Sequence, residues 1–149
     1  MRRFYTHLAM TVLVLMTMSG CNKNNGDIGL WFGLWHLDSI EVNGEPQDGY
    51  DGNFYFLFQN KVFCIRWVDE HNHDYVESFA QWHEGDAGNT LTINFVDDRY
   101  SPRVSEIVPD PYLDEVTTMD VVTLTSTNMV LSHITTDGST ITYRLTKWK

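Results

Sequence analysis

Histidines and acids gather in two short stretches whose side chains are of the kinds that hold metal ions. His71 and His73 lie one residue apart, with Asp74 beside them and His83 further along the chain. A zinc site requires three or four ligands that converge in space, and this spacing secures only two. The stretch from Asp48 to Asn53 carries acids and glycines but lacks the spaced ligands and the final Glu of a calcium loop. We therefore interpret both stretches as exposed polar turns, keep zinc at His71 and His73 as the alternative, and expect no cofactor.

Signatures of catalysis are absent from the sequence. It contains no Gly-x-Ser-x-Gly elbow, no glycine-rich phosphate loop and no His-Glu-x-x-His pair. The 20 acidic residues would allow a carboxylate pair of the kind that hydrolases use, but no pattern marks any of them as buried. We therefore expect that the protein is not an enzyme.

The N-terminal residues are typical of a targeting segment. Arg2 and Arg3 precede an apolar run from Leu8 to Met18, and small residues lead from there into Cys21. This order is typical of a secretory signal peptide. The run is shorter than the roughly 20 apolar residues that a membrane-spanning helix needs. We expect residues 1–20 to be removed.

The stretch from Met18 to Cys21 resembles the bacterial lipobox, in which the cysteine becomes an acylated N-terminus. The resemblance implies lipid attachment at Cys21, a polar tether over residues 21–29 and a folded domain over residues 30–149. Contact with the membrane is then through the lipid anchor only. Asn22, which is not acidic, favours the outer membrane of a bacterial cell envelope and leaves its two faces open. An ordinary signal peptide with an incidental Cys21 is the alternative.

Charge and length limit the partners of the domain. The chain has 149 residues, enough for one domain, and a formal net charge of -10. Removing residues 1–20 takes away Arg2 and Arg3 and no acid, which leaves eight basic residues, twenty acidic residues and a charge of -12. Because a phosphate backbone is held by clustered cations, nucleic acid is not expected as a partner. We expect a monomer.

Cys64 is the one cysteine left if Cys21 is acylated, and a single thiol forms no internal disulfide. It lies in a strand-like run, and we interpret it as a small buried hydrophobe rather than a reactive nucleophile. The fold must therefore be held together by its core.

Strand-like runs alternate with turn clusters beyond the tether, without any helix-length periodicity. Only three alanines occur, whereas Val and Thr recur along the chain, which favours strands over helices. The first strand changes phase between Leu37 and Ile40, which predicts a bulge at Asp38-Ser39. The eight predicted strands are Gly33 to Val42, Asn53 to Gln59, Val62 to Val68, Tyr75 to His83, Thr90 to Val96, Thr118 to Leu124, Asn128 to Thr135 and Ser139 to Lys147.

Hairpin registers predict which side chains face inward. A two-residue turn at Asn60-Lys61 puts six large apolar side chains on one face. A three-residue loop that ends in a left-handed Gly138 does the same for the last hairpin, and a four-residue loop carries that face into the preceding strand. The predicted pairs are Phe58 with Phe63, Phe56 with Ile65, Phe54 with Trp67, His133 with Ile141, Leu131 with Tyr143, Met129 with Leu145, Leu124 with Met129 and Val122 with Leu131, while Leu91, Ile93 and Phe95 also face inward.

The fold class follows from this pattern. Eight sequential antiparallel strands, each with one apolar face, bury that face by closing into an up-and-down β-barrel, which also removes the sheet edges. A β-sandwich is the alternative. The interior of an eight-stranded barrel is either filled by its own side chains or holds one small ligand.

Several short motifs, taken in order, resemble the bacterial lipocalin-like family, many members of which are secreted lipoproteins. The motifs are Gly33-Leu34-Trp35, Phe54-Tyr55-Phe56, Trp82 with Gly85-Asp86, Asn89 to Ile93, Leu124-Thr125 with Met129 to Leu131, and Tyr143-Arg144-Leu145. The resemblance covers most of Gly33 to Lys147 and implies a lipocalin-like barrel. It also implies that Trp35 stacks with Arg144 as a cation–π pair, although the register above points Arg144 outward.

A long loop over residues 97–117 contains three prolines and six acids. Loops of this length are usually functional or disordered. The loop is either a lid or partner-facing surface, or an insertion that packs its own apolar residues over one end of the barrel.

Two hypotheses for the function follow. In the first, the protein is a membrane-tethered binding module for a small apolar or amphipathic molecule. In the second, the barrel is solidly packed and the acidic loop 97–117 contacts an envelope protein or a glycan. His133 is either a polar handle for the ligand or a satisfied core histidine. The candidate ligand-binding residues are Phe54, Phe56, Phe58, Phe63, Ile65, Trp67, Leu131, His133 and Tyr143.

Overall fold

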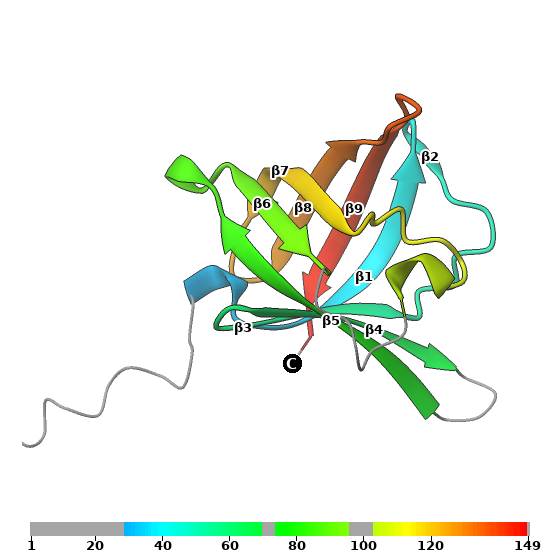
Figure 1. Ribbon diagram of the computed structural model, residues 1–149, viewed down its shortest axis with the longest axis horizontal. Coiled ribbons are helices and arrows are strands. Elements are labelled where there is room, and N and C mark those ends of the chain that lie inside the picture. The colour runs from blue at the N-terminus through cyan, green and yellow to red at the C-terminus, as the bar shows by residue number, and fades with distance from the viewer. Residues whose placement is uncertain (1–28, 70–73, 96–102, 149) are drawn as a thin grey trace, which may run out of the picture.

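The strands between Gly33 and Lys147 form a closed antiparallel β-barrel (Figure 1). The computed structural model describes residues 29–69, 74–95 and 103–148. From β3 to β9 each strand pairs antiparallel with the next one along the chain, and β1 pairs with both β3 and β9, which closes the barrel. The strands in the described residues are β1 (Gly33–Val42), β2 (Glu45–Pro46), β3 (Phe54–Gln59), β4 (Val62–Asp69), β5 (Asp74–Glu84), β6 (Thr90–Asn94), β7 (Val116–Leu124), β8 (Asn128–Ile134) and β9 (Thr140–Lys147).

Three short 3-10 helices accompany the strands: η1 (Gly29–Trp31), η2 (Asp86–Gly88) and η3 (Val104–Glu106). The barrel fold and its eight wall strands confirm the prediction from the sequence. The short β2 was not predicted, because its two residues extend a turn by pairing with the end of β1. No helix in the described part of the chain is long and apolar enough to cross a membrane. Cys21, His71, His73 and residues 97–102 lie outside the described residues, so the predictions made for them stay predictions.

The predicted registers of the first and last hairpins are confirmed. Phe58 pairs with Phe63 across the Asn60-Lys61 turn, and Leu131 pairs with Tyr143 in the last hairpin. Gly138 has a φ of 88°, in the left-handed region that glycine adopts without steric cost. The two hairpins therefore direct their apolar sides into one interior.

The bulge predicted in β1 is also confirmed. Leu37 pairs with Leu145 of β9, but Ser39 pairs with the next residue, Arg144, so Asp38 is skipped. A bulge shifts the inward phase by one residue. As a result Trp35, Leu37 and Ile40 are all buried although they are not in one alternation.

The prediction that Val122 faces inward opposite Leu131 was wrong. Val121 pairs with Leu131, the register shifts between Val121 and Thr123, and Val122 is 62% exposed. The extra residue of this second bulge turns Val122 outward. Met119, which is fully buried, and the partly buried Val121 take the inward positions of β7.

The barrel interior is an aromatic core. Phe56 lies against Phe63, with ring centroids 5.1 Å apart, and against Tyr143 at 5.9 Å. Phe58 also contacts Phe63, at 5.2 Å, and Phe95 contacts it at 6.0 Å. Burying a large apolar side chain of this kind contributes about 1.5–3 kcal/mol. Rings from three strands (β3, β4 and β9) and from the segment after β6 therefore meet across the barrel and hold it closed.

Candidate functional site

Of the nine residues predicted to bind a ligand, eight are buried in this core. Trp67 is only partly buried and packs against the core from its margin, because β4 extends there beyond the closed part of the barrel (Figure 1). The structure therefore brings the predicted residues together on one face. Ring contacts join five of them, which are Phe56, Phe58, Phe63, His133 and Tyr143. A ligand among these residues stays a prediction.

His133 and Tyr143 form a polar pair within this apolar set. Their rings are stacked with an interplanar angle of 6°, and His133 Nε2 lies 3.0 Å from the Tyr143 hydroxyl. That hydroxyl donates to the Pro111 carbonyl at 2.8 Å, so it accepts from His133 Nε2–H. Burial lowers the pKa of the His133 imidazole, which nearby Asp114 partly opposes. His133 is thus a core histidine whose partner is the tyrosine hydroxyl.

The described part of the long loop, residues 103–117, packs onto the barrel. Val104, Ile107 and Leu113 are buried in the same core cluster, and the Gln47 side-chain amide donates to the Asp110 carbonyl at 2.9 Å. The segment therefore covers the barrel end at which Tyr143 reaches Pro111. Of the two interpretations of this loop, packing of its own apolar residues agrees with these contacts.

A hollow of about 300 Å³ remains beside this segment. It is lined by Phe95, Arg103, Val104, Ser105, Leu113, Asp114 and Glu115.

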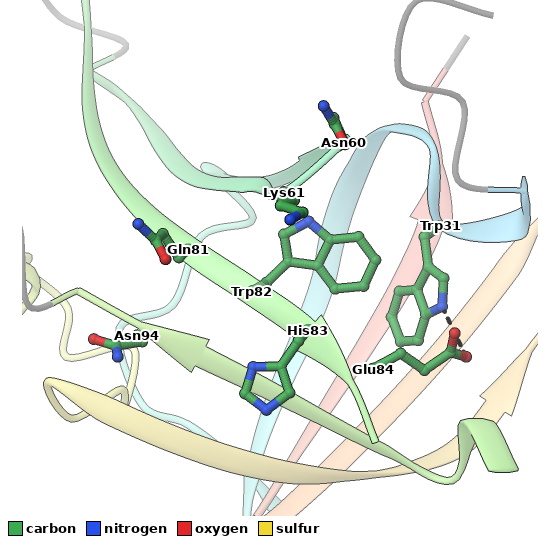
Figure 2. Close-up of a pocket in the computed structure, with 8 residues that line it drawn as sticks. All are labelled: Trp31, Asn60, Lys61, Gln81, Trp82, His83, Glu84 and Asn94. Atoms are coloured by element: carbon green, nitrogen blue, oxygen red, sulfur yellow. Dashed lines mark hydrogen bonds between the residues drawn. The ribbon is translucent and has the colours of Figure 1, made fainter. Parts of the chain in front are cut away.

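A larger pocket, of about 620 Å³, lies at the edge of the barrel beside β5 (Figure 2). Pairing between β4 and β5 begins at Val62 with Gln81, whereas Trp82 to Glu84 continue beside β6. β5 therefore runs past the Asn60-Lys61 turn and leaves a notch in the wall. Trp31, carried by η1, lies in this notch. The described lining residues are Trp31, Asn60, Lys61, Gln81, Trp82, His83, Glu84 and Asn94.

Two indole rings form the inner wall of this pocket. The Trp31 and Trp82 centroids are 5.4 Å apart, and both rings rest on Phe58 at 5.2 Å. Trp31 Nε1 donates to Glu84 Oε1 at 3.2 Å, and Trp35 Nε1 donates to the Trp31 carbonyl at 3.0 Å. These contacts fix Trp31 in place, so the pocket has a rigid aromatic side.

Lys147 anchors the turn that carries Trp31. Its Nζ donates to the carbonyls of Leu30 and Phe32 and lies 4.3 Å from the centre of the Trp35 ring. The expected cation–π pair of Trp35 with Arg144 was wrong. Arg144 points outward and pairs with Glu41, with Nε 2.6 Å from Oε1. The cation over Trp35 comes instead from Lys147, which is on the inward side of β9 near its end.

Trp82 carries a buried donor without a partner. Its side chain is 9% exposed, and its Nε1 has no hydrogen-bond partner among the described residues. Such a donor costs about 1–3 kcal/mol. Figure 2 shows the nitrogen edge of this indole turned toward the Asn60-Lys61 turn, and the Trp82 backbone N–H donates to the Lys61 carbonyl at 3.2 Å. The unpartnered donor therefore lies on the side of Trp82 that faces Asn60 and Lys61, both of which line the pocket.

Neither Trp31 nor Trp82 was predicted to bind a ligand from the sequence. Trp82 shares its inward phase with Ser78 and Ala80 of β5, so alternation marks it as a core residue. The only signal for the notch is in the lengths of two predicted strands. When Tyr75 to His83 pairs antiparallel with Val62 to Val68, its last residues have no partner in that strand. Nothing in the sequence pattern placed Trp31 in that notch.

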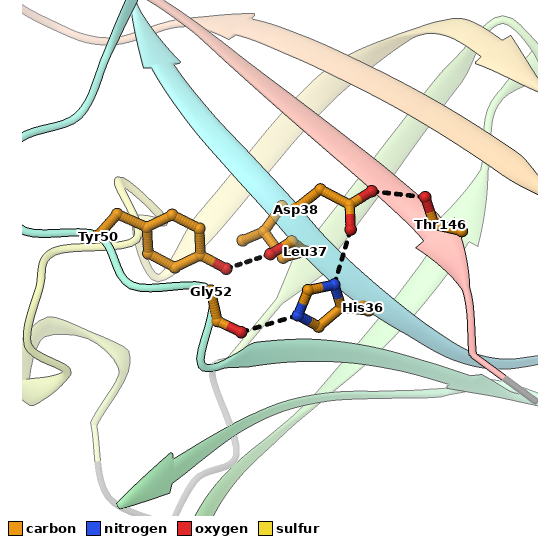
Figure 3. Close-up of polar contacts among 6 residues, drawn as sticks. All are labelled: His36, Leu37, Asp38, Tyr50, Gly52 and Thr146. Atoms are coloured by element: carbon orange, nitrogen blue, oxygen red, sulfur yellow. Dashed lines mark hydrogen bonds and ion pairs between the residues drawn. The ribbon is translucent and has the colours of Figure 1, made fainter. Parts of the chain in front are cut away.

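A second polar group lies on the outside of the barrel (Figure 3). His36 Nδ1 is 2.7 Å from Asp38 Oδ1, and its Nε2 is 2.8 Å from the Gly52 carbonyl. Thr146 Oγ1 donates to the other carboxylate oxygen of Asp38 at 2.5 Å. Both ring nitrogens of His36 face acceptors, and the hydroxyl donates to the carboxylate rather than to the imidazole. The group therefore ties β1 to β9 and to the connection before β3, without the geometry of an activated nucleophile.

Metal ligands do not converge in the part of the chain that the structure describes, where no cluster of three or more His, Cys, Asp or Glu residues could hold an ion. The Asp48 to Asn53 stretch is a turn region in which Gly49 and Gly52 have positive φ. Tyr50 in this stretch donates its hydroxyl to the Leu37 carbonyl. These residues therefore fix the long connection between β1 and β3.

The closed eight-stranded wall, with a short N-terminal turn packed against it and Trp35 pointing inward, is a lipocalin-like fold. No protein-family model and no curated protein matches the sequence. Among solved structures, a lipocalin-like protein from Bacteroides uniformis ATCC 8492 has a TM-score of 0.60 and 15% identity, over 78% of this chain and 98% of that one. An uncharacterized protein from Bacteroides eggerthii DSM 20697 has a TM-score of 0.62 and 17% identity, over 79% and 99%. At these identities the likeness concerns the fold.

Proposed function

We propose that this protein is a lipid-anchored binding module of the bacterial cell envelope that takes a small amphipathic molecule in the pocket beside Trp31 and Trp82. The observation that carries the proposal is the buried, unpartnered Nε1 of Trp82, a residue that lines a pocket of about 620 Å³. Small-molecule sites are clefts of roughly 300–1,000 Å³ with apolar walls and a few polar groups. A ligand acceptor would give the buried donor the partner that it lacks.

The barrel centre is the less favourable place for a ligand. Phe56, Phe63 and Tyr143 are fully buried and in ring contact, so a ligand there would have to separate them. Lost packing of this kind costs several kcal/mol. The pocket beside Trp82 needs no such opening.

The tether supports a place for the pocket near the membrane. With Cys21 acylated, the polar stretch 21–29 leads directly into η1, and η1 carries Trp31. The anchored end of the chain therefore meets the barrel beside the pocket. The charge of -12 on the mature chain keeps the domain itself off anionic headgroups.

Native mass spectrometry on protein purified from membranes in mild detergent tests the binding proposal. We expect a bound small molecule, and we expect Gln81→Phe, which narrows the pocket mouth, to remove it. The matched control is Thr123→Phe, at an exposed position of β7 outside the described lining. Retention of the same bound mass by Gln81→Phe, or its absence from the wild-type protein together with no Trp fluorescence response to laurate, deoxycholate, haem or neutral sugars, would contradict the proposal.

A further inference from the structure

The pocket beside Trp31 and Trp82 has a rim made mainly of uncharged polar side chains. Asn60 and Gln81 each carry an amide, which both donates and accepts, and Asn94 also lines the pocket. His83, on the outer side of β5, adds an imidazole at the rim (Figure 2). Groups that both donate and accept match ligand hydroxyls, which do the same.

The charges at the pocket do not select an anion. Lys61 is the one basic and Glu84 the one acidic residue among the described lining residues. Glu84 already accepts a hydrogen bond from Trp31 Nε1 at 3.2 Å. The two formal charges cancel, and the chain as a whole carries -10, so phosphate and carboxylate groups gain no net attraction at this site.

A purely apolar ligand does not fit the wall either. The Trp82 indole needs an acceptor for its Nε1–H, and hydrocarbon has none. Burying the donor against hydrocarbon would keep its cost of about 1–3 kcal/mol. The apolar part of the wall consists of Trp31 and Trp82, which are 3% and 9% exposed. It therefore offers the edges of two rings rather than a wide apolar surface.

We propose that the ligand of this pocket is a neutral carbohydrate, one hydroxyl of which accepts from Trp82 Nε1–H while the amides of Asn60 and Gln81 bond its neighbours. This assignment rests on the proposed function, because it names the ligand class of the same pocket. A sugar ring has apolar C–H faces as well as hydroxyls, so it suits an indole edge inside a polar rim.

The indole N–H signals in an NMR titration of the folded protein provide the test. The probes are glucose, N-acetylglucosamine, maltose and cellobiose, with laurate and inorganic phosphate as the competing classes. We expect a sugar to shift the Trp82 Nε1–H resonance, which is assigned by its loss in Trp82→Phe, and to leave that of the exposed Trp148 in place. Trp82→Phe should weaken sugar binding about 5–10-fold, the equivalent of about 1–1.4 kcal/mol, whereas Trp148→Phe should not change it.

Stability separates a binding role from a structural one. Because Trp82→Phe removes a donor that has no partner in the free protein, we expect its melting temperature to stay within a few degrees of wild type while sugar affinity falls. A shift of Trp82 Nε1–H by laurate or phosphate but by no sugar would overturn the carbohydrate assignment and leave the proposed function standing. Failure of every probe to move that resonance would overturn both.

Discussion

The stacked pair of His133 and Tyr143 lies where the barrel meets the segment over residues 103–117. The Tyr143 hydroxyl serves two buried groups at once, since it accepts from His133 and donates to Pro111. Removing the hydroxyl would leave both without this partner. A side chain that satisfies two neighbours in this way fixes the position of each of them.

Tyr143→Phe should therefore lower the free energy of unfolding by about 1–3 kcal/mol, the cost of leaving buried polar groups unpaired. Urea denaturation followed by circular dichroism measures it. Tyr75→Phe is the matched control, because Tyr75 is 56% exposed and the variant keeps the ring that lies 4.7 Å from the Arg66 guanidinium. Equal stabilities of the two variants would show that the hydroxyl is not part of the core network.

The His133 imidazole should make stability depend on pH. Burial lowers its pKa in the folded protein below the usual 6.5, so the unfolded chain takes up the proton first. Stability is then highest above pH 6.5 and falls as the pH drops from there toward the lowered value. Urea denaturation from about pH 7.5 to about pH 5 should show this loss. His133→Phe should flatten it and the exposed His83→Gln should not; an unchanged slope in His133→Phe would assign the loss to other groups.

Cys64 should be inert in the folded protein. Burial, helped by Glu77 of the neighbouring strand, raises the pKa of its thiol to about 12, and the thiolate is the reactive form. In a Cys21→Ser form, Ellman's reagent at about pH 8 should label nothing until urea is added. Full labelling in native buffer would mean that the β4–β5 face opens readily.

Sequence alternation predicts most buried residues of the barrel, because side chains in a strand have a period of two and hairpin loops set the register. It does not locate the pocket. Trp82 has the same inward phase as core residues. Its nitrogen lies beside a notch that forms because β5 continues past the last residue that it pairs with in β4. Trp31 precedes the first strand, where no period exists.

At the scale of elements, bulges decide where alternation fails. The bulge in β1 is visible as a change of phase between Leu37 and Ile40, whereas the one in β7 falls within the run Val121-Val122, where adjacent valines satisfy either phase. Only tertiary packing decides between the two phases. It buries Met119 and turns Val122 outward. Apolar pairs of this kind leave a register undetermined from sequence.

The segment over residues 103–117 should behave as part of the core. Ile107 is 3% exposed, while its neighbour Val108 is 80% exposed. Ile107→Ala should cost about 2–4 kcal/mol of unfolding free energy, and Val108→Ala should change it by less than about 0.5 kcal/mol. Chemical denaturation of the two variants is the measurement. A small effect of Ile107→Ala would instead favour a free, partner-facing segment.

For the whole molecule, the lipid attachment that we propose at Cys21 would decide where the barrel works. We expect the wild-type chain in the membrane fraction of bacterial cells and Cys21→Ser in the soluble fraction, because acyl chains supply the only predicted anchor. Metabolic labelling with an azido fatty acid and density-gradient separation of the two membranes measure attachment and place. Membrane association of Cys21→Ser without label would contradict the anchor.

We propose that this closed lipocalin-like barrel binds its ligand at its edge rather than at its centre. A crystal structure of the protein taken directly from its native membrane, without added ligand, tests this claim most directly. We predict a bound small molecule with an acceptor oxygen about 2.7–3.2 Å from Trp82 Nε1 and the rings of Phe56, Phe63 and Tyr143 still in contact. A molecule lodged between those three rings, with the pocket beside Trp82 holding only water, would contradict it.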